Sequence, residues 1–102
     1  MQTPASLPDT ADRPLRDSNV VDEWLADGSM VLFHTTSRQL ITLNATGALV
    51  WKHCDGTCTV AEIEAELRAM FPGVPTIAPD VGAILRELRE RGMVNPNRSP
   101  IP

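Results

Sequence analysis

The feature that most constrains the fold is a change in the spacing of apolar residues near Asn44. Before this residue the apolar spacing is about two positions, which is typical of half-buried strands. After it the spacing is about 3.6 positions, which is typical of helices. Strands and helices that are segregated along a chain indicate an α+β domain in which helices cover one face of a sheet. We therefore predict a three-stranded antiparallel sheet followed by three helices.

The predicted sheet lies within residues 20–43. Residues 20–25 favour β-structure and precede Asp27-Gly28, a dipeptide that is typical of two-residue hairpins. Residues 29–34 form the return strand, polar residues 35–38 form a second turn, and residues 39–43 form the third strand. No long crossover is present, so the three strands pair in antiparallel fashion.

The first two predicted helices have recognisable starts. Asn44 is a good N-cap for a helix over residues 45–54, and Asp55-Gly56 ends it. Thr59 and Glu62 fit a capping box, in which the two side chains satisfy each other's unpaired amide donors. The second helix stops at Pro72-Gly73.

The third helix is predicted to start near Pro79-Asp80 and to end before Gly92 as its C-cap. The two residues after Gly92, Met93 and Val94, are expected to pack back onto the core. One apolar stripe runs along the helix and consists of Val81, Ile84, Leu85 and Leu88.

Both ends of the chain are rich in proline and poor in large apolar side chains. Such segments bury too little apolar surface to offset the entropy of ordering them. We predict mobile tails over residues 1–18 and 95–102 around a single domain over residues 19–94, which is too small for a deep catalytic cleft.

Charge and hydropathy exclude several classes of function. The chain has 9 Lys plus Arg against 13 Asp plus Glu, a net charge of −4, which argues against a general nucleic-acid binder. No apolar run is long enough to span a bilayer, and the start of the chain lacks a secretory signal. We expect a cytoplasmic protein.

No catalytic, metal or cofactor set is apparent. His34 and His53 are the only histidines, and Cys54 and Cys58 are separated by three residues rather than the two that are typical of redox pairs and zinc knuckles. We expect free thiols, no bound metal or cofactor, and no enzymatic activity.

Two features are candidates for a binding surface. The third strand, if it lies at a sheet edge, has no proline or lysine to block pairing with an added strand. On the third helix, Gly82, Arg86 and Arg89 flank the apolar stripe on one side and would suit an acidic peptide. From the residues alone, an ordinary edge strand and solvated helix charges are the better explanation of these features.

The stretch from Asp27 to Val94 resembles the PqqD family, also called the RiPP recognition elements. The matching pieces, in order, are DG before VLF, LNATGALVW, DGTCTVAEI and DVGAILRELRERGMV. The resemblance implies a winged-helix-like fold and a domain that binds the leader segment of a ribosomally made precursor peptide. In this family the leader adds as a strand beside the third strand and packs against the third helix. The core segment is then presented to a maturation enzyme, often a radical S-adenosylmethionine enzyme in pyrroloquinoline quinone biosynthesis, or a leader peptidase in lasso-peptide pathways.

Carried onto this chain, the resemblance implies a binding strand over residues 38–43 and a helical wall over residues 81–89. Which flank of the helix faces the peptide stays open, as does the choice between a monomer and a weak homodimer. The expected peptide-binding residues are Arg38, Gln39, Leu40, Ile41, Thr42, Leu43, Val81, Gly82, Leu85, Arg86, Leu88 and Arg89. Two alternatives remain: a winged-helix DNA-binding regulator, which shares this fold, and an interaction domain with no peptide ligand.

Overall fold

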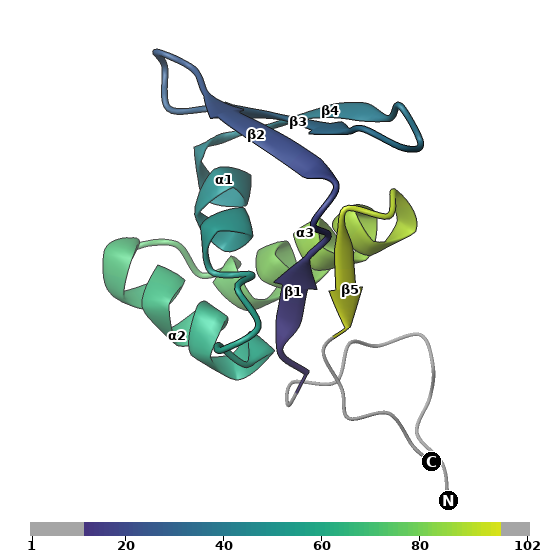
Figure 1. Cartoon of the computed structure of the whole chain (residues 1–102). Coiled ribbons are helices and arrows are strands. Elements are labelled where there is room, and N and C mark those ends of the chain that lie inside the picture. Colours follow the sequence, from purple (N-terminus) through teal and green to yellow (C-terminus); the bar gives the residue numbers. More distant parts are fainter. Residues whose placement is uncertain (1–11, 97–102) are drawn as a thin grey trace, which may run out of the picture.

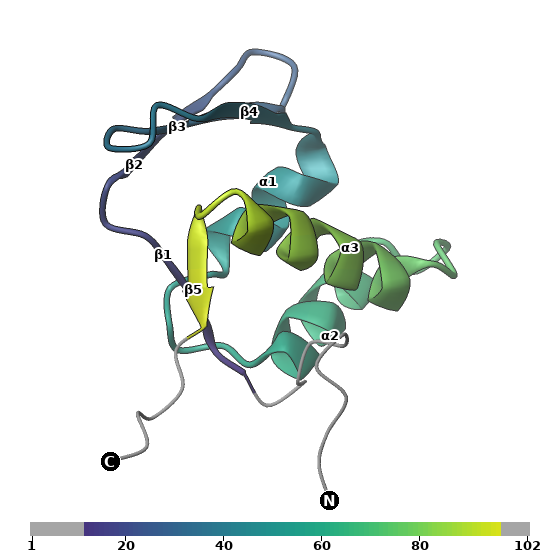
Figure 2. The same ribbon diagram turned by 90° about the vertical axis from the view of Figure 1, so that its right-hand side faces the viewer.

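The computed structural model describes residues 12–96, which form five strands and three helices (Figure 1). Strands β2 (Val20–Trp24), β3 (Met30–His34) and β4 (Leu40–Leu43) form an antiparallel sheet in the order β2-β3-β4. Helices α1 (Ala45–Lys52), α2 (Val60–Met70) and α3 (Ile77–Glu90) all lie on one side of this sheet (Figures 1 and 2). The predicted α+β architecture is therefore confirmed. None of the helices in this part of the chain is long and apolar enough to cross a membrane.

The predicted meander is confirmed in its order and in its second turn. The first turn is not the predicted two-residue hairpin, because the Leu25 N–H donates to the Ser29 carbonyl at 2.8 Å and three residues, 26–28, form the loop. Gly28 has a φ of +90°, which glycine adopts without strain, in the turn between β2 and β3. In the second turn Arg38 has a φ of +68°, so this arginine occupies a left-handed conformation just before β4. Register pairs Leu32 with Ile41 across β3 and β4. The inner sheet face is thereby set against the helices.

The first two helices begin where their caps predict. The Asn44 side chain accepts the Gly47 N–H at 2.8 Å. Thr59 and Glu62 form the reciprocal capping box, with bonds of 2.8 and 3.1 Å. Helix α3 begins at Ile77, two residues before the predicted Pro79, because proline is tolerated within the first helical turn, where its missing N–H has no helical partner to lose.

The core lies between the inner sheet face and the helices. Trp51 is its largest side chain and is 1% exposed, and its Nε1–H donates to Asp22 Oδ2 at 2.7 Å. Met93 and Val94 pack into the core after Gly92, as predicted. Its other fully buried apolar side chains, at 1% exposed or less, are Met30, Leu32, Ala48, Val50, Cys54, Val60, Ile63, Leu67, Val81, Leu85 and Leu88.

The predicted tail boundaries are wrong for residues 12–18 and 95–96. Strand β1 (Pro14–Arg16) pairs antiparallel with β5 (Val94–Pro96) to form a second, two-stranded sheet. The Arg16 N–H donates to the Cys54 carbonyl at 2.8 Å, and the Arg16 guanidinium donates to the carbonyls at the end of α1, at 3.1 Å each. These long-range bonds order a segment whose composition alone indicates a tail. The remainder of both predicted tails, residues 1–11 and 97–102, lies outside the described residues.

Candidate binding edge and pocket

Strand β4 forms one edge of the three-stranded sheet. In an antiparallel ladder, alternate residues bond to the neighbouring strand, and those between them turn their N–H and C=O groups the other way. The His34 N–H donates to the Gln39 carbonyl at 2.9 Å. With the observed register, Ile41 and Leu43 therefore bond toward β3. Leu40 and Thr42 direct their backbone groups to the open edge.

The β2–β3 pairing supports this assignment independently. The Thr35 N–H donates to the Asn19 carbonyl at 2.9 Å, so odd-numbered residues of β3 bond to β2 and even-numbered ones bond to β4. Side chains of β4 follow the same alternation. Ile41 is 7% exposed on the inner face, whereas Leu40 is 61% exposed on the outer face.

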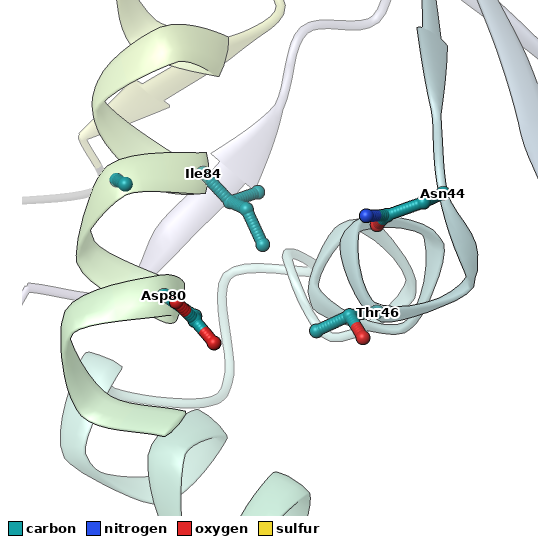
Figure 3. A pocket seen from close by; sticks show the side chains of 5 residues that line it. Asn44, Thr46, Asp80 and Ile84 are labelled. Carbon is teal, nitrogen blue, oxygen red and sulfur yellow. The ribbon is translucent and has the colours of Figure 1, made fainter. Parts of the chain in front are cut away.

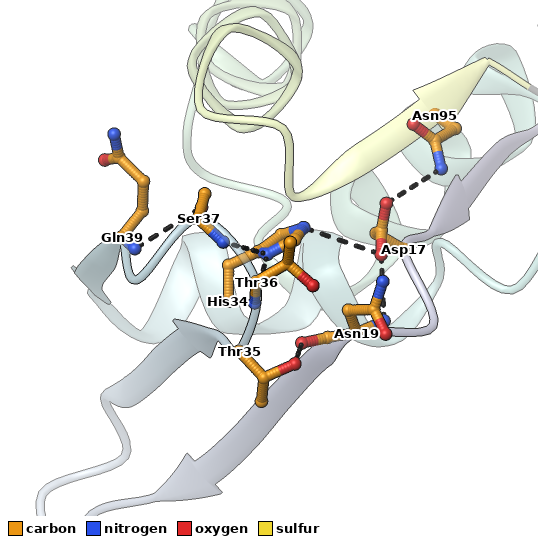
Figure 4. Close-up of polar contacts among 8 residues, drawn as sticks. All are labelled: Asp17, Asn19, His34, Thr35, Thr36, Ser37, Gln39 and Asn95. Atoms are coloured by element: carbon orange, nitrogen blue, oxygen red, sulfur yellow. Dashed lines mark hydrogen bonds and ion pairs between the residues drawn. The ribbon is translucent and has the colours of Figure 1, made fainter.

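A polar network holds the turn that leads into β4 (Figure 4). The backbone N–H groups of Thr36 and Ser37 donate to His34 Nδ1 at 3.2 and 3.1 Å. The ring hydrogen of His34 therefore lies on Nε2, which is 3.6 Å from Asp17 Oδ1. The Asn19 N–H bonded to Asp17 lowers the pKa of that carboxyl group. Both nitrogens of this buried histidine thus have structural partners.

An open pocket lies between the start of α1 and one flank of α3, and we call it the α1–α3 pocket (Figure 3). It follows β4 directly, because Asn44 is both the residue after Leu43 and the N-cap of α1. The end of β4 packs closely on the first turn of α1, since a Cβ added at Gly47 would lie 3.3 Å from Leu43 Cβ. The pocket is lined by Asn44, Thr46, Asp80, Ala83 and Ile84.

The other predicted wall residues lie away from this pocket. Val81, Leu85 and Leu88 are fully buried in the core, so their side chains do not reach the surface. Projected around the helix at about 100° per residue, Gly82, Arg86 and Arg89 fall on the flank opposite the pocket-lining residues of α3.

Contacts of Arg89 agree with this projection. Its guanidinium lies 3.8 Å from Asp12 Oδ2, and the carbonyl of Asp12 accepts the Val60 N–H at the start of α2. Arg89 therefore faces the chain segment before β1 and α2, and it does not lie beside β4. The flank that lines the pocket consists of Asp80, Ala83 and Ile84, and none of the three is among the predicted peptide-binding residues. The one sequence signal for this flank is that Asp80 lies four positions before Ile84, at the border of the apolar stripe of the helix.

The two cysteines differ in their surroundings, since Cys54 is buried and Cys58 is half-buried. Burial raises the pKa of the Cys54 thiol to about 12, and its Sγ donates to the Val50 carbonyl at 3.2 Å. Both cysteines are free thiols. Within residues 12–96 no three histidine, cysteine or acidic side chains gather closely enough to hold a metal ion.

Comparison with known proteins places this chain in a family. Residues 29–94, more than half of the chain, match the family described as Coenzyme PQQ synthesis protein D (PqqD). The chain belongs to the PqqD family. The matched region begins just before β3 and includes β4 and all three helices of this PqqD-family chain.

Two solved structures share the fold of this PqqD-family chain. One is described as TbiB1 in complex with the TbiA(beta) leader peptide. It is 23% identical with a TM-score of 0.70, and the match covers 84% of this chain and 99% of that one. The other, a lasso peptide synthetase B1 complexed with the leader peptide, is 24% identical with a TM-score of 0.69, and the match covers 82% and 99%. No curated protein sequence matches the chain.

Proposed function

We propose that this PqqD-family chain binds the leader segment of a ribosomally made precursor peptide as an added strand on β4. The observation that carries the proposal is the open edge of β4, where Leu40 and Thr42 turn backbone donors and acceptors outward. An extended peptide gains affinity from main-chain bonds at such an edge and specificity from side-chain pockets beside it.

The family and its relatives support this function. Both solved relatives are described as complexes with a leader peptide, and the match covers 99% of each of them. The conversion of the precursor then belongs to a separate enzyme, a radical S-adenosylmethionine maturase or a leader peptidase, to which this chain presents the core segment. The chain itself acts as a binding protein.

The opposite edge of the sheet is less suited to an added strand. Strand β2 carries Asp22 and Glu23, and charged side chains discourage pairing at sheet edges. Asp22 also holds Trp51 through its carboxylate. By contrast, the four residues of β4, LITL, include no charge and no proline. The leader therefore selects β4.

Amide hydrogen exchange, followed by NMR, tests the proposal. The probe is the synthetic leader segment of the short precursor peptide encoded beside this chain. In the free protein the amides of Ile41 and Leu43 exchange slowly because they bond to β3, and those of Leu40 and Thr42 exchange rapidly. The leader should slow exchange at Leu40 and Thr42 by at least about tenfold. Slowed exchange at residues 20–24 instead, or at neither edge, contradicts the proposal.

A further inference from the structure

We infer that the α1–α3 pocket takes a lysine or arginine side chain of the leader, an inference that rests on the proposed function. The pocket follows the end of β4, so a strand added at that edge brings a side chain to it. Its lining combines one carboxylate with oxygen acceptors and apolar carbon, a set that matches a basic side chain with its aliphatic stem.

The carboxylate of Asp80 supplies the charge. Among residues 12–96 it is the only charged one that lines the pocket. The Thr76 hydroxyl donates to its Oδ2 at 2.9 Å, and no hydrogen bond from residues 12–96 reaches its Oδ1. Asp80 extends from α3 toward the start of α1, where Thr46 and Asn44 lie across the pocket (Figure 3). A leader ammonium or guanidinium group therefore finds an unused carboxylate oxygen in the pocket wall.

The oxygens opposite Asp80 accept further hydrogen bonds. Asn44 Oδ1 accepts the Gly47 N–H, and a carbonyl oxygen retains a second lone pair. The hydroxyl of Thr46 also accepts. The starts of α1 and α3 carry about half a positive charge each, spread over several N–H groups. A direct charge-assisted bond to Asp80 outweighs these screened partial charges at short range.

Apolar carbon completes the match. Ile84 is half-buried and packs against the core. The remaining lining residue, Ala83, contributes its methyl side chain. Lysine and arginine place their methylene stems on such surfaces while their charged ends reach polar partners. The residues predicted to attract an acidic leader, Arg86 and Arg89, lie on the other flank of α3 and do not line this pocket.

The experiment uses the fluorescein-labelled leader of the precursor encoded beside this chain, with each lysine and arginine replaced singly by glutamine. Binding is measured by anisotropy for the native chain, for Asp80→Asn, and for Glu90→Gln. The last variant is the matched control, because Glu90 is an exposed acid on the same helix, away from the pocket. Asparagine at residue 80 still accepts from Thr76, and thermal unfolding verifies that both variants fold.

We expect Asp80→Asn to weaken leader binding about tenfold and Glu90→Gln less than about twofold. One of the glutamine-substituted leaders should bind the native chain with about tenfold lower affinity than the unsubstituted leader does. The same substitution should cause no further loss of affinity for Asp80→Asn. Rescue of Asp80→Lys by a leader with glutamate at that position would support the same contact. Equal binding to the native chain and to Asp80→Asn overturns this inference, as does tight binding of a leader without lysine or arginine. Either result leaves the strand-addition proposal intact, whereas a leader that does not protect Leu40 and Thr42 refutes that proposal.

Discussion

Replacement of Thr42 by proline tests the open edge of β4 without disturbing the hydrogen bonds between β3 and β4. Proline removes the N–H of residue 42, and the register directs that N–H away from β3. The preceding residue, Ile41, is already extended within a strand, as the residue before proline prefers. The substitution therefore removes no hydrogen bond of the domain, and we expect its unfolding free energy to fall by less than about 1 kcal/mol.

Leader binding should respond much more strongly. One main-chain bond is lost, and the ring occupies the space that the partner strand needs at that point. Together these effects should cost about 1.5–3 kcal/mol, or roughly ten- to a hundredfold in affinity. Fluorescence anisotropy measures the affinity, and urea denaturation measures the stability. Thr42→Val is the matched control, since it keeps the N–H and favours the strand.

The same substitution one residue earlier should behave in the opposite way. Proline at residue 41 removes a bond to β3 and replaces a side chain that is 7% exposed, so it should destabilise the domain by about 3 kcal/mol or more. Equal leader affinity for folded Thr42→Pro and Thr42→Val would refute the assignment of outward and inward backbone groups on β4.

Three further predictions concern stability and reactivity. Arg16→Ala removes two bonds to the last carbonyls of α1 and a cation–π contact with Trp51 at 5.7 Å, so the unfolding free energy in urea should fall by about 1–2 kcal/mol. The pKa of Asp17 is lowered from 3.8, so its stabilising contribution exists above that pH and is lost as the pH falls below it. The urea midpoint of Asp17→Asn should therefore change less than that of the native chain from about pH 5 to about pH 3. Iodoacetamide should modify the half-buried Cys58 at least roughly a hundredfold faster than Cys54, whose buried thiol has a pKa of about 12, and peptide mass spectrometry would detect the reverse order.

The elements that the sequence predicts well depend on residues that are close together in the chain. The capping box needs only Thr59 and Glu62, three positions apart, and the position of the first hairpin needs only Asp27-Gly28 between two apolar runs. The length of that hairpin loop, three residues rather than two, was not predicted. Such local signals determine where an element starts and ends. The order of the three strands and the short turns between them are then compatible with only one topology, an antiparallel meander.

The small second sheet depends on pairing between residues far apart in the chain. Pro14 pairs with Pro96 and Arg16 with Val94, and each strand has three residues, too few for apolar periodicity to appear. Prolines at both ends have the composition of a tail. The bonds that order this segment come from residues that fold next to it, such as the carbonyls of Cys54 and Met93.

Which flank of α3 lines the pocket was also beyond the sequence. An apolar stripe indicates which residues of a helix are buried, but it does not indicate which of the two flanking faces borders a pocket. The choice depends on where α1 lies, because Asn44 and Thr46 close the pocket on one side of α3 only. Two arginines on the other flank gave a clear charge pattern, and one of them faces Asp12 in the folded chain.

The edge that suits a leader also suits a second copy of the chain. Within residues 12–96 the other strand edges are less available: β1 bonds to residues 54–56, β2 carries acidic residues and β5 ends in proline. Any homodimer of this domain should therefore form through β4 and compete with the leader for the same backbone groups. We expect saturating leader peptide, and equally Thr42→Pro, to convert such a dimer to monomer in sedimentation velocity. A dimer that persists with the leader bound would place self-association on another surface and leave β4 to the peptide alone.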